Sequence, residues 1–345
     1  MFFKKTLSDP WVIFPFLIFL VFLSPLLVVL SSLLGNYSDN WTHLTTYVLD
    51  SYIYNSIFLI LGVSVISLAL GVGTAWVISN YNFSGRRLFD WALILPLAVP
   101  PYILAYTFTG LFDSFGSANN LVREFFSLNS NYIFFPNIRN IYGAIIVFSF
   151  TLYPYIYLAT RMALINQSRS ILEVGKTLGL NNLGIVFKLV LPMIRPAIVA
   201  GLMLVIMETL SDFGAVEHFA IPTFTTGIFR AWFGMNDITT AKQLAALLFI
   251  LFLFFLIIEK YSRKKIKFNQ SLTSNRELVP VKLTGLKGFS ATLLCSIPIV
   301  IGFIIPVSQL CYWAISYNME YFDYYFISSA INTCLLYTSP SPRDS

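Results

Sequence analysis

Long, almost uncharged apolar runs recur along the chain, and they restrict its fold more than any other feature. The first run, Trp11 to Leu34, contains no charged residue. A membrane-crossing helix needs about 20 mostly apolar residues, and lipid cannot satisfy free backbone groups, so such runs must be helical. We expect spans at about 11–34, 56–79, 88–112, 141–160, 194–213, 243–259 and 289–316, with an eighth starting near Phe326.

Composition leads to the same fold class, an all-α polytopic membrane protein. Charged residues make up 11% of the 345 residues, against about 25% in a typical soluble domain. The net charge of +6 does not indicate a nucleic-acid partner, because the basic residues lie between apolar runs. The first run is too long for a signal peptide and has no small-residue cleavage site, so we expect it to be an uncleaved span.

Lysine and arginine are distributed unevenly between the two sides of these spans. With the N-terminus inside, 17 of the 22 basic residues fall on the cytoplasmic side and 4 fall outside, with Arg343 set aside. The positive-inside rule therefore predicts a cytoplasmic N-terminus. It also places the segment after the fourth span and the loop 261–287 in the cytoplasm.

The loop 261–287 predicts a division of the chain into two halves. Apolar stretches with a proline inside the span occur on both sides of it, at Pro25 and Pro306. A weak internal repeat of this kind is typical of transporters. We expect a first half at 1–260, a cytoplasmic linker at 261–287 and the start of a second half at 288–333.

The end of the chain departs from the apolar pattern. The eighth run stops in SPSPRDS, and CLLYTSPSPRD back-translates into DNA that resembles a sequencing adaptor. Residues 334–345 are therefore expected to be an artefact, with the natural chain continuing beyond a truncated span. The alternative is a natural polar tail.

The stretch EVGKTLGLNNLGIVFKLVLP, residues 173–192, has the organisation of a helix, a turn and a helix. Ser170 and Glu173 have capping-box spacing. Gly175 and Gly179 lie four residues apart on one face, where the missing side chains permit close approach of another surface. GLNNLG predicts a turn, and Pro192 suits the first turn of the next helix.

This spacing resembles the EAA loop of ABC importer permeases. The family pattern is Glu-Ala-Ala, three residues, Gly, nine residues, Ile, one residue, Leu-Pro. Here Val174 and Gly175 replace the alanines and Leu189 replaces the isoleucine, while the other spacings are kept. In that family the loop inserts into a groove on the ATPase subunit and couples ATP hydrolysis to opening of the pore.

The resemblance implies that residues 173–192 form an ATPase-docking segment, and this name is kept below. Its implied docking residues are Glu173, Val174, Gly175, Gly179, Leu189, Leu191 and Pro192. The alternative is an amphipathic elbow at the membrane surface that binds no partner.

Two further stretches, 95–112 and 208–233, resemble the ferric-iron permeases of this family, in which one chain carries two fused halves. The resemblance implies a type I ABC importer permease bundle, with seven spans and a truncated eighth, in the bacterial inner membrane. It would move ferric iron from a periplasmic binding protein to the cytoplasm. The implied partners are a cytoplasmic ATPase dimer, that binding protein and the lipid bilayer.

Glu208 and Asp212 form a candidate substrate path. They lie four residues apart at the end of the fifth span, which would place them on one helical face. Carboxylates are the hard oxygen ligands that a ferric ion prefers, and charge within a span usually faces water or the bundle interior. The alternative is a helix-end pair held by hydrogen bonds or by a basic partner such as Arg230. His218 is a weaker candidate, and Asp113 is expected to be a solvated loop residue.

Several motifs are absent from the sequence. It has no G-x-x-x-x-G-K-[ST] run, so we expect ATP and magnesium to bind a partner subunit and this chain to bind no cofactor. It has no metal-ligand cluster, and no nucleophile–base set indicates an enzyme. Two other functions remain open: the same architecture with thiamine, sulfate or phosphonate as cargo, and an ion-coupled secondary transporter.

Overall fold

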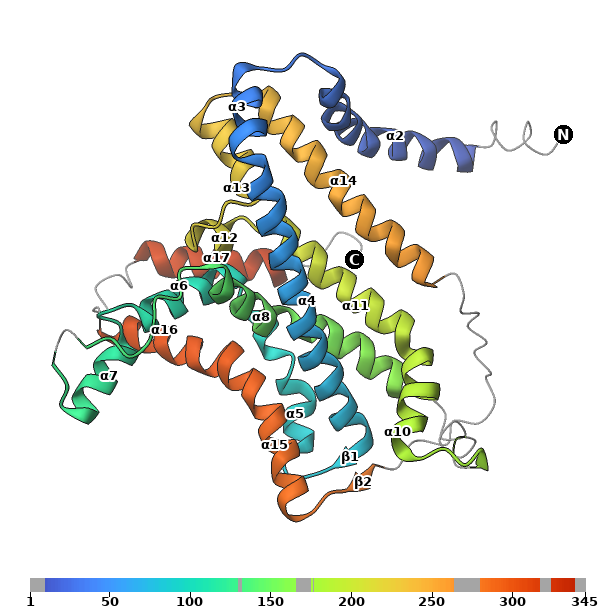
Figure 1. Cartoon of the computed structure of the whole chain (residues 1–345), viewed down its shortest axis with the longest axis vertical. Helices are drawn as coiled ribbons and strands as arrows, with labels where there is room; N and C mark the ends of the chain where they lie inside the picture. The colour runs from blue at the N-terminus through green and yellow to red at the C-terminus, as the bar shows by residue number, and fades with distance from the viewer. Residues whose placement is uncertain are drawn as a thin grey trace.

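The computed structural model describes residues 10–129, 132–165, 175, 177–263, 280–316 and 324–338, which are predominantly helical (Figure 1). Within these residues, six helical stretches are long and apolar enough to cross a membrane. They are Trp11–Leu34, Leu49–Asn80, Ile141–Ile165, Val186–Ser211, Ile238–Tyr261 and Gly285–Ser316. The sequence-based prediction of an all-α polytopic membrane protein is confirmed.

The third expected span, 88–112, is not one continuous helix. The segment consists of α5 (Arg86–Ala92), η2 (Leu95–Ala98), α6 (Pro101–Phe112) and α7 (Ser117–Phe126), bent by 88° at the break. Val99 and Pro100 both have extended backbone, with ψ of 111° and 145°. Each precedes a proline, whose ring disfavours helical geometry in the residue before it. The prolines therefore break this span.

Three helices form the centre of the bundle: α4 (Leu49–Asn80), α8 (Ile141–Ile165) and α11 (Leu191–Ser211). A Cβ added at Gly71 of α4 would lie 2.7 Å from the Cβ of Ile156 on α8. A Cβ added at Gly201 of α11 would lie 2.8 Å from the Cα of the same residue. Glycines thus let two helices press on the α8 backbone, which is how helices approach closely in membranes.

Hydrogen bonds attach the first part of the broken span to α8. Tyr153 Oη donates to the Leu93 carbonyl at 2.8 Å, and Tyr157 Oη donates to the Asp90 carbonyl at 2.9 Å. Arg161 Nη2 lies 2.6 Å from the carboxylate of Asp90. These contacts hold α5 against α8 and satisfy polar groups that lipid could not.

The helices at the start of the chain meet those after α11 at one end of the bundle. They are α2 (Pro10–Ser31), η1 (Ser32–Leu34), α3 (Asp39–Tyr47), α12 (Gly214–His218), α13 (Phe224–Phe229), η4 (Arg230–Gly234) and α14 (Ile238–Arg263). Asp237, just before α14, accepts a 2.6 Å hydrogen bond from Ser38 Oγ, just before α3. This contact joins the two segments.

The residues from the end of the expected linker onward pack on the expected first half. They form β2 (Val281–Lys282), α15 (Gly285–Ile299), η5 (Val300–Ile304), α16 (Ile305–Ser316) and α17 (Tyr324–Thr338). Strand β2 pairs in parallel with β1 (Tyr81–Asn82), which follows α4. A Cβ added at Gly302 would lie 2.6 Å from the Phe150 carbonyl of α8, so η5 lies directly on that helix.

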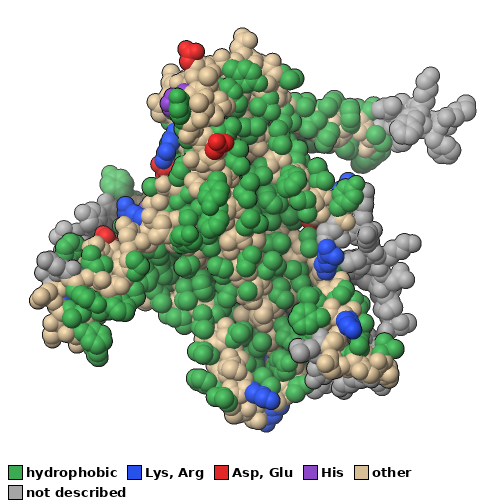
Figure 2. Space-filling model, viewed as in Figure 1, with side chains coloured by type: hydrophobic (Ala, Val, Ile, Leu, Met, Phe, Trp, Pro, Cys, Tyr) green, Lys and Arg blue, Asp and Glu red, His purple; other side chains and the backbone are tan. Residues whose placement is uncertain are grey.

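The two ends of the bundle differ in what they carry. Strands β1 and β2, the short helix α10 (Asn182–Ile185) and the start of α15 lie at one end, and α3 and α13 lie at the other (Figure 1). Figure 2 shows apolar side chains covering the middle of the face in view. Basic side chains lie at the β1–β2 end of that face. We call that end the inner end, following the positive-inside prediction.

Candidate functional site

The docking segment is described from its third residue, since Glu173 and Val174 lie outside the described residues together with position 176. Gly175 is buried between the two arms of the segment, which are the residues before and after the turn at Gly179. A Cβ there would lie 2.7 Å from Ile185 Cγ1 and 3.0 Å from Leu189 Cδ1. The missing side chain therefore lets the arms of this chain pack on each other.

Gly179 has a different role from Gly175. Its φ is +71°, and no atom lies within 4 Å of the position that a Cβ would occupy. The next residue, Leu180, donates its N–H to the Gly175 carbonyl at 3.0 Å. A left-handed glycine with this hydrogen bond ends the first arm, and Asn181 Oδ1 accepts the Gly184 N–H at 2.7 Å as the next helix begins. The predicted turn is confirmed.

The second arm enters the membrane without a break. Helix α10 continues through a π-helical turn, η3 (Val186–Val190), into α11, whose first turn contains Pro192. The sequence predicted a helix start at Pro192, and α11 is assigned from Leu191, but the helix already runs through the preceding residues. Leu178 and Phe187 expose 67% and 64% of their surface, so the segment presents two large, mostly exposed apolar side chains.

The predicted shared helical face of Glu208 and Asp212 is wrong. Helix α11 ends at Ser211, and Asp212 has extended backbone with ψ of 133°. Its Oδ1 instead accepts the backbone N–H groups of Ala215 and Val216 at 2.9 and 3.3 Å. The carboxylate of Asp212 therefore caps the start of α12, which agrees with the structural alternative, while Glu208 is exposed.

Arg230, the suggested basic partner of that pair, lies near another acid. Its Nη2 is 3.7 Å from Glu217 Oε2, and both side chains are largely exposed. Among the described residues, no group of three His, Cys, Asp or Glu side chains could hold a metal ion. The part of the substrate path played by Glu208 and Asp212 remains a prediction.

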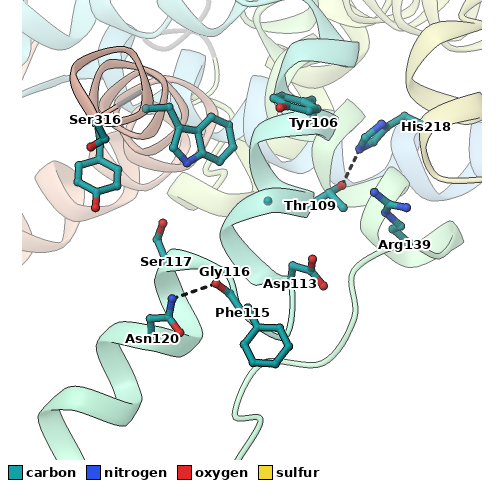
Figure 3. Close-up of a pocket in the computed structure, with 13 residues that line it drawn as sticks. Tyr106, Thr109, Asp113, Phe115, Gly116, Ser117, Asn120, Arg139, His218 and Ser316 are labelled. Carbon is teal, nitrogen blue, oxygen red and sulfur yellow. Dashed lines mark hydrogen bonds between the residues drawn. The ribbon is translucent and has the colours of Figure 1, made fainter. Parts of the chain in front are cut away.

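A cavity of about 500 Å³ lies between α6, α7, α12, α16 and the segment before α8 (Figure 3). We call it the α6–α16 cavity. Its wall mixes aromatic, polar and charged side chains. Its lining residues are Tyr106, Thr109, Gly110, Asp113, Phe115, Gly116, Ser117, Asn120, Arg139, His218, Tyr312, Trp313 and Ser316.

Contacts between distant segments build this cavity. A Cβ at Gly110 would lie 2.7 Å from Cη2 of Trp313, so this indole lies directly against α6 at Gly110. Gln309 Nε2 donates to Ser117 Oγ at 3.0 Å. These two contacts join α16 to α6 and α7, so residues expected in the second half complete a cavity of the first.

His218 is held at the cavity wall by Thr109. The Thr109 hydroxyl donates to the Ala105 carbonyl at 2.6 Å, and Thr109 Oγ1 also forms a 3.0 Å hydrogen bond with His218 Nε2. Burial lowers the pKa of His218, and the positive charge of Arg139 lowers it further. Both effects favour the neutral imidazole ring.

Only part of this cavity is predicted by the sequence. Asp113 was expected to be a solvated loop residue and His218 was a weak candidate, while Arg139 and Trp313 had no predicted role in a site. The relevant residues are spread from Tyr106 to Ser316, and no local spacing relates them. The bent span at the prolines was the available signal, because irregular backbone at membrane depth often accompanies a binding site in transporters.

The family profile described as binding-protein-dependent transport system inner membrane component matches residues 65–267. The chain is 26% identical over 211 residues to the Fe(3+)-transport system permease protein FbpB 2 of Haemophilus influenzae, covering 61% of this chain and 37% of the relative. It is 27% identical over 153 residues to the molybdenum transport system permease protein ModB of the same organism, covering 44% and 64%.

A third relative is the sulfate transport system permease protein CysT of Salmonella typhimurium, 29% identical over 157 residues that cover 46% of this chain and 54% of the relative. The matched region thus spans under two thirds of each of these relatives. Among solved structures, a bacterial ABC transporter involved in the import of the acidic polysaccharide alginate is similar, with a TM-score of 0.58 and 16% identity over 77% of this chain and 100% of the other.

Proposed function

We propose that this chain, which belongs to the family of binding-protein-dependent transport system inner membrane components, forms part of the membrane path of an ATP-driven importer of the ABC type. The observation that carries the proposal is the family match over residues 65–267. That range takes in the second half of α4 and all of α8, α11 and α14, the helices that make up most of the bundle. The chain contributes the pore and no ATP chemistry of its own.

The proposed site for the ATPase dimer is the docking segment at the inner end. Leu178 and Phe187 are large, mostly exposed apolar side chains, Leu178 beside the turn at Gly179 and Phe187 in the second arm. Exposed apolar groups at the end of a membrane bundle are typical of an interface with another protein. The open space at Gly179 would let a partner backbone approach closely.

A periplasmic binding protein is the proposed source of the cargo, at the end opposite the docking segment. This follows from family membership and from the predicted cytoplasmic N-terminus. The proposed location is the bacterial inner membrane.

The finer proposal for the cargo is ferric iron. It is supported by the sequence resemblance to ferric-iron permeases and by the similarity to an Fe(3+)-transport permease. Molybdenum and sulfate transport permeases are also among the similar proteins, so the test must compare these cargos directly. We expect ATP-dependent uptake of labelled ferric iron into vesicles to exceed that of molybdate and sulfate.

The permease role can be tested at Leu178. Leu178→Glu places a charge on the proposed ATPase interface and should abolish both co-purification of the ATPase and uptake of the cargo. Leu286→Glu is the matched control, because Leu286 lies at the same end and is 83% exposed but belongs to α15. Uptake that continues without any ATPase would contradict the proposal and favour an ion-coupled transporter.

A further inference from the structure

Two opposite charges line the α6–α16 cavity without neutralising each other. Arg139 and Asp113 both belong to its wall (Figure 3). Within the described part of the chain they form no ion pair with each other, and the guanidinium of Arg139 has no hydrogen bond. Asp113 Oδ1 accepts the Ser114 N–H at 2.8 Å, which leaves Oδ2 available. A ligand that entered the cavity would meet one unpaired cation and one unpaired anion.

Other polar groups lie in the same cavity wall, close to these two charges. Gly116 and Ser117 line the cavity where α7 begins, and the N-terminus of a helix carries a partial positive charge. His218 also lines the cavity and is hydrogen-bonded to Thr109 Oγ1 through Nε2 at 3.0 Å. The nearby cation Arg123 is engaged elsewhere, since its Nε donates to the Tyr132 carbonyl at 3.0 Å and its Nη1 to Asn120 Oδ1 at 3.3 Å.

Aromatic rings form much of the rest of the wall. The Tyr106 ring lies 5.5 Å from the Trp313 ring and 5.9 Å from the His218 ring, with both pairs edge to face. Phe115 and Tyr312 also line the space. A volume of about 500 Å³ is in the range of sites for small organic molecules and much exceeds the size of a bare inorganic ion.

We propose that the α6–α16 cavity binds a small zwitterionic organic molecule, with its anionic oxygen group at Arg139, its ammonium group at Asp113 and its carbon body against the aromatic rings. A bare metal cation would be repelled by Arg139 and would find no cluster of three ligating side chains in the described residues. A fully ionised oxyanion would be repelled by Asp113, which can only accept hydrogen bonds. The binding claim goes beyond the permease role and does not depend on it.

The test measures binding to the purified full chain in nanodiscs by calorimetry, with three probes that share one ammonioethyl body. They are 2-aminoethylphosphonate, taurine and β-alanine, whose anionic groups are phosphonate, sulfonate and carboxylate. Ethylphosphonate and ethylamine each present only one of the two charges. We expect at least one zwitterion to bind, and each half-ligand to bind roughly tenfold or more weakly, since one charged hydrogen bond is lost.

Variants assign each charge to its end of the ligand. Arg139→Gln and Asp113→Asn should each weaken zwitterion binding by roughly tenfold or more. In addition, Asp113→Asn should abolish the preference for the zwitterion over ethylphosphonate, and Arg139→Gln the preference over ethylamine. Asp50→Asn and Lys242→Gln, whose side chains do not line the cavity, should leave binding unchanged. An unaltered size-exclusion profile shows that each variant is folded.

Three results would overturn the proposal: no probe binds saturably, the half-ligands bind as tightly as the zwitterions, or both cavity variants bind normally. Uptake of ferric iron is measured separately, so failure of the zwitterion site and failure of the permease role are distinguishable. Binding without transport of the zwitterion would still support the site.

Discussion

The docking segment and the α6–α16 cavity are stabilised in different ways. The docking segment is a local structure, in which Gly175 lets Ile185 and Leu189 pack across a single turn. The cavity is assembled from α6, α7, α12 and α16 through a few polar and aromatic contacts. Local apolar packing should survive changes elsewhere, whereas a cavity built from distant segments should be sensitive to each of them.

Both regions nevertheless rest on α8. Ile185 and Val190 of the docking segment share a buried cluster with Leu164 of α8. Phe108 and Val216, which support the cavity helices, share another with Phe148 of the same helix. A defect on α8 should therefore damage both regions, while a defect in either one should spare the other.

The largest effect is expected at the contact between α11 and α8. Gly201→Leu would force a side chain into the Ile156 backbone, where even a Cβ would lie 2.8 Å from Cα. Overpacking of this kind against backbone costs about 3 kcal/mol or more. Both ATPase docking and cavity binding should be lost, together with most of the monodisperse protein in detergent.

Gly73→Leu is the matched control for this change. Gly73 lies on α4, but no atom lies within 4 Å of its added Cβ. The control should retain monodisperse protein and a near-normal melting temperature. Equal damage from both variants would mean that span hydrophobicity, and not close packing, limits the stability of the bundle.

The second effect should separate the two regions. Gly175→Leu would overlap Ile185 and Leu189 and should cost about 1–3 kcal/mol by overpacking. The arms of the docking segment should move apart, so ATPase co-purification should fall while cavity binding persists. Gly184→Ala is a milder control, because its added Cβ would mainly meet the Asn181 side chain. Loss of cavity binding in Gly175→Leu would contradict the independence of the regions.

The same contrast explains what the sequence could predict. The spans followed from runs of about 20 apolar residues, and the turn at Gly179 followed from a pattern contained within a few residues. The break of the third span is explained by its prolines, because a proline constrains only its immediate neighbours. In each case the determining interactions are local.

The sequence-based predictions were wrong or incomplete where contacts between distant segments determine the structure. Asp212 was expected on the helical face of Glu208, but its hydrogen bonds to the start of α12 take it out of α11. Arg139 and Trp313 lie far apart in the sequence and share a cavity only because η5 and α16 pack on the first half.

Three π-helical turns in the described residues were also not predicted, and two of them precede a proline. Val186–Val190 and Val300–Ile304 each end two residues before a proline, Pro192 and Pro306, whereas no proline closely follows Arg230–Gly234. A proline removes one helical hydrogen bond, and local widening of the helix accommodates the change. Pro25 also lies within a helix, α2, yet no such turn precedes it, so a proline alone does not predict one.

The third effect is confined to the cavity. Trp313→Ala would remove the indole that packs on Gly110 and contacts the Tyr106 ring. The side chain is half-buried, so we expect a loss of about 1–2 kcal/mol, with faster hydrogen exchange in α16. ATPase docking should be unchanged, and binding of the zwitterion should weaken. The matched control is Trp232→Ala, an exposed tryptophan that does not line the cavity.

The smallest effect is expected at Asp237, which belongs to neither region. Its carboxylate accepts hydrogen bonds from Ser38 Oγ at 2.6 Å, Asn40 Nδ2 at 3.1 Å and the Thr240 N–H at 3.0 Å. Burial acts to raise the pKa of Asp237, but these hydrogen bonds outweigh it and hold the pKa below its ordinary value.

Because the folded-state pKa of Asp237 is lowered, its charge stabilises the protein above the unfolded pKa of about 3.9. That contribution disappears as the pH falls through the folded-state pKa. Asp237→Asn should therefore lower the melting temperature at pH 7, by the equivalent of about 1 kcal/mol or less. The difference in melting temperature from the unmodified protein should narrow below about pH 4.

Asp39→Asn, in the first turn of α3, controls for loss of a neighbouring charge. A gap that stayed constant from pH 7 to pH 4 and below would show that the hydrogen bonds, and not the charge, stabilise the junction of α3 and α14. Both docking and cavity binding should remain normal in this variant, since neither region contacts Asp237.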